Sequence, residues 1–242
     1  MTGGVVAVVA HPDDESLIAG GTLALAATGG LPTGAFALTR GELGPIADAA
    51  LATEETLGAV RERELHAAAA ALGLTWSACL QEPDGELEWA DEERVAAALA
   101  ERLAADPPAV VLTFGADGLY DHPDHVAAGR IATLAVARLG GGIVLQAAWP
   151  PDLITRLVAA AHGRELPTDL WGIPPEAFGS EGPPPAVVVD GTPVLTRKLA
   201  AIRAHRTQLA ADHLLHALPD DLAREFLAHE PWRLADQPGR RG

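Results

Sequence analysis

The sequence predicts an α/β fold, a Rossmann-like three-layer sandwich with a mostly parallel sheet and helices on both faces. The 242 residues are 48% hydrophobic with a mean hydropathy of +0.14, enough to bury one sizeable core. Short apolar runs rich in valine, such as residues 5–10 (VVAVVA), are typical of strands buried on both faces of a parallel sheet. These runs alternate with helical segments, which implies right-handed crossovers and a layer of helices on each face.

Strands and helices are expected to alternate along the first 149 residues. Each helix is followed by glycine or proline, as Gly73 follows the second one. Apolar runs predict strands at residues 5–10, 34–39, 74–80, 109–114 and 143–149. Helical spacing predicts the connecting helices at residues 16–28, 54–72, 91–105 and 125–138.

The composition changes after Pro150, where prolines interrupt the pattern through residues 150–185. This proline-rich segment is predicted to be an insertion or lid near the active-site face. Regular patterning resumes with the apolar run 186–190 and a helix at 194–209. We therefore expect a single domain over residues 1–236 and a disordered tail at 237–242.

The charge balance excludes several classes of partner. Seventeen Lys and Arg against thirty-three Asp and Glu give a net charge of −16, which repels phosphate backbones and anionic lipid surfaces. The single cysteine, Cys79, cannot form an internal disulfide and is expected to be a core residue of its strand. No signal-like or membrane-spanning run is found near the N-terminus. We expect a cytoplasmic protein with no nucleic-acid or membrane partner, and the sequence does not indicate its oligomeric state.

The first strand leads directly into His11-Pro12-Asp13-Asp14-Glu15. In an open α/β sheet, ligands bind in the crevice at the carboxyl ends of the strands. His11 precedes a proline and is therefore extended, while the carboxylates that follow lie where a helix begins and negative charge is favoured. The alternative is that these acidic residues only cap a helix.

The fourth strand leads into a second motif, Asp121-His122-Pro123-Asp124-His125. Because Pro123 suits the first helical position, we expect His122 near the N-cap and His125 one turn inside, on the same side. The alternative is a capped surface loop with solvated histidines. Together the two motifs supply the N and O ligands that a catalytic zinc uses, with an open position for water. Iron or cobalt suits the same ligand types.

Four segments resemble the PIG-L/LmbE family of zinc-dependent N-acetylglucosaminide deacetylases. They are AHPDDE after the first strand, TRGELG at residues 39–44, RERELHAAAAALG at 61–73 and GLYDHPDHVAAGR at 118–130. KLAAIRAHRTQ at residues 198–208 resembles a late helix of the same family. The resemblance implies removal of an N-acetyl group from an amino sugar.

The resemblance also implies roles for individual residues. It implies that the zinc ligands are His11, Asp14 and His125. Asp13 is the implied general base, His122 the implied oxyanion or leaving-group partner, and Asp124 is implied to orient one of the two histidines beside it. Chemistry agrees, since Asp13 adjoins a ligand without being one and can take a proton from water. A protonated His122 would stabilise the developing oxyanion.

Candidates for substrate contacts are weaker. The resemblance implies that Arg61 faces the sugar or its aglycone, although an ion pair with Glu64 one turn away is the alternative. His205 in the late helix is expected either to close over the site or to pack against the sheet. Three loop residues at the carboxyl end of the sheet are candidates for binding sugar hydroxyls, namely Arg40, Glu42 and Asp117.

These observations favour a zinc hydrolase acting on a small amino sugar or thiol glycoconjugate. One alternative is an amidase, similar to mycothiol S-conjugate amidase, with the same metal and base but a wider pocket. Another is a non-catalytic, metal-containing binding protein of Rossmann-like fold. No GxGxxG or Walker pattern is present, so a dinucleotide cofactor is not expected.

Overall fold

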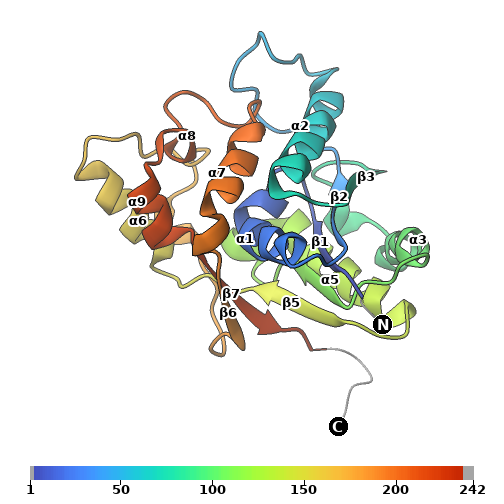
Figure 1. The fold of residues 1–242 in the computed structure, drawn as a ribbon. Helices are drawn as coiled ribbons and strands as arrows, with labels where there is room; N and C mark the ends of the chain where they lie inside the picture. The colour runs from blue at the N-terminus through green and yellow to red at the C-terminus, as the bar shows by residue number, and fades with distance from the viewer. Residues whose placement is uncertain (1–2, 237–242) are drawn as a thin grey trace.

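The computed structural model describes residues 3–236 and confirms the predicted α/β fold (Figure 1). One seven-stranded sheet has the order β3-β2-β1-β4-β5-β7-β6. Its strands are β1 (Val5–Val9), β2 (Thr33–Thr39), β3 (Trp76–Glu82), β4 (Val110–Thr113), β5 (Ile143–Ala147), β6 (Val187–Asp190) and β7 (His229–Leu234). The first five strands pair in parallel, and β7 is antiparallel to both β5 and β6.

Strand order reverses between β1 and β4, which are hydrogen-bonded neighbours. From β1 the chain moves outward through β2 to β3, and then returns to β4 and continues through β5 on the other side. Right-handed crossovers in opposite directions place the connecting helices on opposite faces. Helices α1, α2 and α7 pack together on one face, and α3 packs against α5 on the other (Figure 1). These helices are α1 (Asp14–Thr28), α2 (Leu57–Leu72), α3 (Glu92–Leu103), α5 (Pro123–Arg138) and α7 (Leu195–Ala204).

The core is centred on the first two strands. Every residue of β1 and β2 is buried, as expected for strands covered on both faces. The edge strand β3 is only partly buried. The predicted strands and helices of the first 149 residues are all present, with ends shifted by a few residues. Gly73 ends α2 in the left-handed conformation (φ 79°), as its sequence position predicted.

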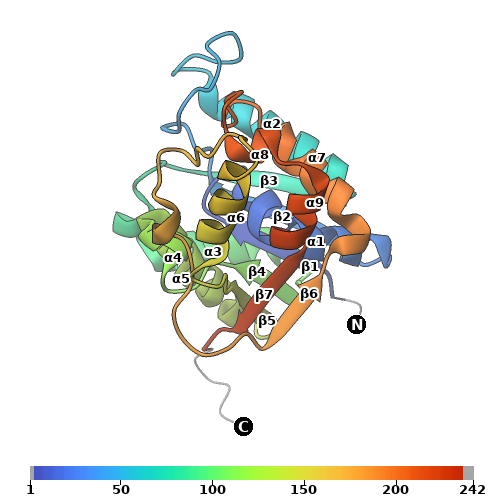
Figure 2. The ribbon, with the colours of Figure 1, turned by 90° about the vertical axis from the view of Figure 1, so that its left-hand side faces the viewer.

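The second half of the chain differs more from the prediction. The helix expected at 194–209 ends at Ala204, because Thr207 bonds Glu64 through both its amide and its hydroxyl and so leaves the helical path. Elements that were not predicted are α4 (Gly118–Asp121), α6 (Leu153–His162), α8 (Leu214–Ala217), α9 (Asp220–Phe226) and β7. Strand β7 has the sequence HEPWRL, whose proline and charged residues do not predict a strand. It forms through pairing with β5 and β6 (Figure 2).

The proline-rich segment 150–185 contains α6 and a short 3₁₀ turn at Pro175–Ala177. Its role as an insertion or lid stays a prediction, and the tail expected at 237–242 lies outside the described residues. Within residues 3–236, no helix is both long and apolar enough to cross a membrane.

A buried ion pair ties the C-terminal strand to two helices. Lys198 Nζ of α7 lies 2.7 Å from Glu230 Oε1 of β7, and both side chains are almost fully buried. The same carboxylate accepts hydrogen bonds from the amides of Gly21 and Thr22 and from the Thr22 hydroxyl, all in α1. Lys198 also donates to the carbonyl of Leu227. These contacts hold α1, α7 and β7 together.

Replacing Lys198 with methionine should destabilise the fold, because the Glu230 carboxylate would stay buried without its counter-charge. We expect Lys198→Met to lower the free energy of unfolding by about 3–5 kcal/mol, measured by urea denaturation. Arg164→Met is the control, since the Arg164–Asp221 pair is exposed and its loss should leave the unfolding curve nearly unchanged. Equal curves for the two variants would contradict a stabilising role for the buried pair.

Cys79 is a partly buried residue of β3, in agreement with its predicted packing role. Burial, reinforced by the nearby Glu62 carboxylate, raises the pKa of the thiol to about 12. Because only the thiolate alkylates, iodoacetamide at pH 8 should label the folded protein at least about a hundredfold more slowly than the urea-unfolded chain. The folded-state rate should continue to rise above pH 10. Mass spectrometry measures both rates, and similar values would show that the thiol is not protected.

Candidate metal and catalytic site

A cavity of about 500 Å³ opens at the carboxyl ends of β1 and β4, where the strand order reverses. Loops that follow these two strands bring both histidine motifs to one place. The side chains from the motifs that line the cavity are His11, Asp13, Asp14, His122 and His125. The predicted convergence of the motifs is therefore confirmed. For the second motif, the alternative of a surface loop with solvated histidines is wrong, because His125 is buried. In the first motif Asp13 makes no side-chain cap hydrogen bond, and Asp14 contacts His11 and His125.

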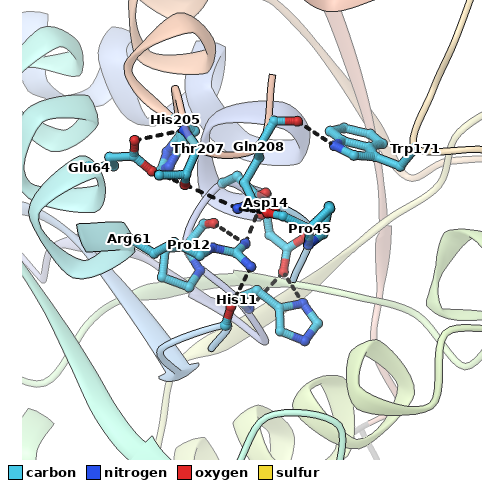
Figure 3. Close-up of polar contacts among 12 residues, drawn as sticks. His11, Pro12, Asp14, Pro45, Arg61, Glu64, Trp171, His205, Thr207 and Gln208 are labelled. Carbon is cyan, nitrogen blue, oxygen red and sulfur yellow. Dashed lines mark hydrogen bonds and ion pairs between the residues drawn. The ribbon is translucent and has the colours of Figure 1, made fainter. Parts of the chain in front are cut away.

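Three side chains form a group that can hold a metal ion. The ligand atoms offered by His11, Asp14 and His125 lie within 4.8 Å of one another. Asp14 Oδ2 lies 3.4 Å from His11 Nδ1, and Asp14 Oδ1 lies 3.3 Å from His125 Nε2 (Figure 3 shows the first contact). Asp14 stands in the first turn of α1, and His125 in the first turn of α5, whose N-cap is His122 as predicted.

The protonation and hydrogen bonding of this group fit a metal such as zinc. His125 Nδ1 bonds the carbonyl of Gly118, while its buried Nε2 makes no hydrogen bond to any part of residues 3–236. Burial lowers the pKa of His125 to about 4, so its imidazole is neutral, as a ligand requires. For Asp14, burial is outweighed by the neighbouring His125 and His11, which lower the carboxyl pKa. For His11, burial is outweighed by hydrogen bonds to Asp124, Asp14 and Asp84, which raise the pKa, so this imidazole must lose a proton to bind a metal. Two imidazoles and a carboxylate are a donor set typical of catalytic zinc.

Two further carboxylates contact the other nitrogen of His11. Its Nε2 lies 3.1 Å from Asp84 Oδ1 and 3.4 Å from Asp124 Oδ2. These three side chains also lie close enough together to hold a cation. However, Asp124 already accepts hydrogen bonds from the amides of Gly85 and Leu87, so it serves better as an acceptor for the His11 ring. Such a carboxylate behind a histidine fixes its tautomer and strengthens it as a ligand.

Asp84 was not identified from the sequence. It lies two residues after the end of β3, at the same edge of the sheet as the histidine motifs, and this position was the available signal. Its second oxygen accepts from the amide of Leu43. Asp124 was expected to orient His122 or His125, yet its carboxylate contacts His11, and only its backbone amide reaches His122.

Asp13 occupies a strained backbone position beside the metal group. Its φ is 126°, which non-glycine residues rarely adopt, and such strain persists only where the surroundings enforce it. Its amide donates to Glu15 Oε2, and its carboxylate lies 3.0 Å from Arg61 Nη2. The same guanidinium donates to the carbonyls of Pro12 and Gly41 (Figure 3 shows the Pro12 contact). Arg61 thus holds the loop that carries Asp13, and it also lines the cavity.

The glycines of the TRGELG segment make room for Arg61. A side-chain carbon at Gly41 or Gly44 would collide with the guanidinium. Gly41 also has a positive φ of 64°. The TRGELG segment therefore contributes to the site by leaving room beside its backbone for the Arg61 guanidinium.

Burial sets the protonation of the two remaining polar groups. It raises the pKa of Asp13 to about 6, partly opposed by Arg61, so the carboxylate is a moderately strong base near neutral pH. Burial and the nearby His11 lower the pKa of His122, which favours its neutral form. His122 Nδ1 accepts from the Asp124 amide, which leaves the ring proton on Nε2. The expected protonated His122 is therefore replaced by a neutral N–H donor.

Buried polar contacts lie beside the site and hold its elements together. His205 Nε2 lies 2.8 Å from Glu15 Oε1, and both side chains are fully buried. His205 therefore packs against the start of α1 while also contributing to the cavity lining. Glu64 bonds Thr207 rather than forming the ion pair with Arg61 that was considered as an alternative (Figure 3).

Three predicted substrate contacts do not line this cavity. Arg40 pairs with Glu62 at 2.9 Å, and Glu42 accepts from the amide of Asp84. Asp117 accepts from the Leu119 amide and from the Ser180 hydroxyl. Arg40 thus contacts helix α2, whereas Glu42 and Asp117 bind neighbouring loops. Trp149 and Trp171 do line the cavity, whereas Trp232 packs against Thr22 in the core.

The fold and site together define an α/β protein with a pocket, at the reversal of its sheet, whose lining includes a His-Asp-His group able to hold a metal ion. The chain belongs to the PIG-L family, whose model, described as GlcNAc-PI de-N-acetylase, matches residues 6–136. The resemblance found in the sequence is thus confirmed.

Individual relatives support this membership over most of the chain. The 1D-myo-inositol 2-acetamido-2-deoxy-alpha-D-glucopyranoside deacetylase of Thermobispora bispora is 33% identical over 271 positions, covering 98% of this chain and 90% of the relative. A protein of the same name from Kineococcus radiotolerans is 34% identical, covering 86% and 69%. The structure of N,N'-diacetylchitobiose deacetylase from Pyrococcus horikoshii shares the fold, with a TM-score of 0.67 at 21% identity, covering 98% of this chain and 87% of the other.

Proposed function

We propose that this protein is a zinc-dependent hydrolase that removes an N-acetyl group from a small amino sugar conjugate. The observation that carries this proposal is the Asp13 carboxylate, held in a strained position next to a His-Asp-His group whose His125 Nε2 makes no hydrogen bond to the described residues. The names of its relatives, which are deacetylases of amino sugar derivatives, support the same reaction.

In this proposal His11, Asp14 and His125 hold the metal. A bound Zn²⁺ supplies polarisation of the amide carbonyl and acidification of water. Asp13 takes the proton from the attacking water and passes it to the departing amine, for which a pKa near 6 is well suited. Arg61 keeps the Asp13 carboxylate directed into the cavity through their 3.0 Å contact.

His122 acts as a neutral donor. Its Nε2–H can bond the carbonyl oxygen as negative charge develops there, because Nδ1 is occupied by the Asp124 amide. Asp84 and Asp124 position His11 by accepting from Nε2, so that Nδ1 is the nitrogen that would hold the metal. A non-catalytic metal protein would have no use for the strained Asp13, and this argues for an enzyme.

The proposed reaction is tested with a panel of N-acetylglucosaminides and zinc-loaded protein. We expect chelator-sensitive release of free amine by the wild type. Asp13→Asn should bind one equivalent of zinc and lose about 10²–10⁴-fold in kcat, because only the base is removed. His125→Ala should lose the zinc itself.

Matched controls separate these effects from folding. Asp121→Asn makes the same exchange at an exposed residue of α4 with φ 57°, which asparagine tolerates. His162→Ala removes an exposed histidine at the end of α6. Both should retain wild-type activity and zinc content. Full activity in Asp13→Asn would refute the assigned base, and full activity without metal would refute the zinc mechanism.

The positioning role of Asp84 predicts a change in metal affinity. Asp84→Asn should weaken zinc binding about 10–100-fold, because the His11 ring loses a charged acceptor at 3.1 Å. Competition with a chromophoric chelator measures this affinity independently of turnover. Asp106→Asn, at an exposed position after α3, is the matched control. Unchanged affinity in Asp84→Asn would exclude the positioning role.

A further inference from the structure

The cavity lining includes two chemically different groups of side chains. One group comprises the histidines and carboxylates of the proposed reaction. The other is an apolar wall, which we define as Leu119, Trp149, Trp171, Ile173, Phe178 and Leu215. Four of these side chains are almost fully buried, whereas Trp171 and Ile173 are half-buried. The wall therefore extends from the interior of the protein to its surface.

Two polar side chains beside the wall, those of Trp171 and Gln208, already have hydrogen-bond partners. Trp171 Nε1 donates to the carbonyl of Gln208 (Figure 3). The Gln208 amide donates to the Pro45 carbonyl and to the Thr207 hydroxyl. A substrate hydroxyl placed against the carbon atoms of the wall would lose its hydrogen bonds to water without replacing them, which is unfavourable.

The charge of the cavity disfavours an anionic substrate. Within residues 3–236, Arg61 is the only lysine or arginine in the cavity lining, and it is committed to Asp13 and to two backbone carbonyls. Asp13, Asp14 and Asp84 line the same space, and the chain carries a net charge of −16. A phosphate would find no free cation in the described lining.

We infer that the substrate is a neutral N-acyl amino sugar that carries an apolar substituent, which lies against the apolar wall. This inference rests on the proposed function and specifies its substrate class. The substituent is either an apolar aglycone or a longer acyl chain. Both differ from the inositol in the names of the relatives, whose hydroxyls the wall would leave unpaired.

The wall also lies mostly outside the region matched by the family model. Apart from Leu119, its residues follow residue 136, where that match ends. Trp171, Ile173 and Phe178 come from the proline-rich segment 150–185. The shared family motifs therefore do not determine this surface.

Two substrate series distinguish the two positions of the substituent. One series comprises alkyl glycosides of N-acetylglucosamine from methyl to hexyl. The other comprises methyl glucosaminides with N-acyl chains from acetyl to hexanoyl. In one of the series, kcat/KM of the zinc-loaded enzyme should rise by about fourfold for each methylene that becomes buried. The value of kcat/KM for the inositol glycoside should not exceed the value for the methyl glycoside.

A polar substitution in the wall should remove this gain. Ile173→Asn places an amide at the half-buried mouth of the wall and should flatten the dependence of kcat/KM on chain length. Ile143→Asn is the matched control, because Ile143 is 38% exposed at the amino end of β5, away from the cavity. It should leave the chain-length dependence intact.

Binding to Asp13→Asn, measured by isothermal titration calorimetry, keeps the two hypotheses separate. Affinity that rises with chain length in one series, and fails to rise when Ile173→Asn is added, supports the wall as an apolar subsite even if no compound is hydrolysed. Failure to hydrolyse any compound would overturn the proposed reaction and leave the inference about the wall standing. Flat affinity and flat kcat/KM in both series, with the methyl glycoside still deacetylated, would overturn the inference alone. A preference for the inositol glycoside would also overturn it.

Discussion

The reversal of strand order between β1 and β4 is the constraint on which the site depends. Because these strands are adjacent and their crossovers diverge to opposite faces, their carboxyl-end loops face one another with no helix between them. The first loop and the helix start that follows it contribute His11 and Asp14, and the start of α5 after the second loop contributes His125. Neither loop holds enough ligands alone, so the pocket exists only where the sheet changes direction. The other side chains that line the cavity surround this crevice.

Placing many charges in this crevice requires compensation. His11 stands among the carboxylates of Asp14, Asp84 and Asp124. Arg61 balances Asp13, and His205 balances Glu15 beneath the site. Each buried carboxylate thus has a cationic or hydrogen-bonding partner, as the low polarisability of a protein interior demands. The electrostatic arrangement is local and does not follow from the overall acidity of the chain.

The sequence predicted the parallel part of the sheet and the convergence of both motifs, since apolar runs and helix starts are local properties. It did not reveal Asp84, whose proximity to His11 arises only when β3 and β1 share a sheet edge. Strand β7 was missed because its residues are suited to a strand only through pairing with β5 and β6. Arg40 and Asp117 were placed at the correct edge of the sheet, but sequence could not show that Glu62 of α2 and Ser180 would engage their side chains. The predicted end of α7 was wrong for the same reason, because Thr207 donates a hydrogen bond to Glu64 of the distant helix α2.

The apolar wall has a consequence for how such a protein diversifies. The reacting side chains are fixed by short loops at the ends of β1 and β4, whereas most of the wall comes from segments after β5 that contribute no member of the metal group. Changes of length or composition between β5 and β6 can therefore alter what is accommodated while the chemistry is inherited unchanged. A change of specificity then needs no change in the reacting side chains, only a different segment between β5 and β6 beside the same crevice.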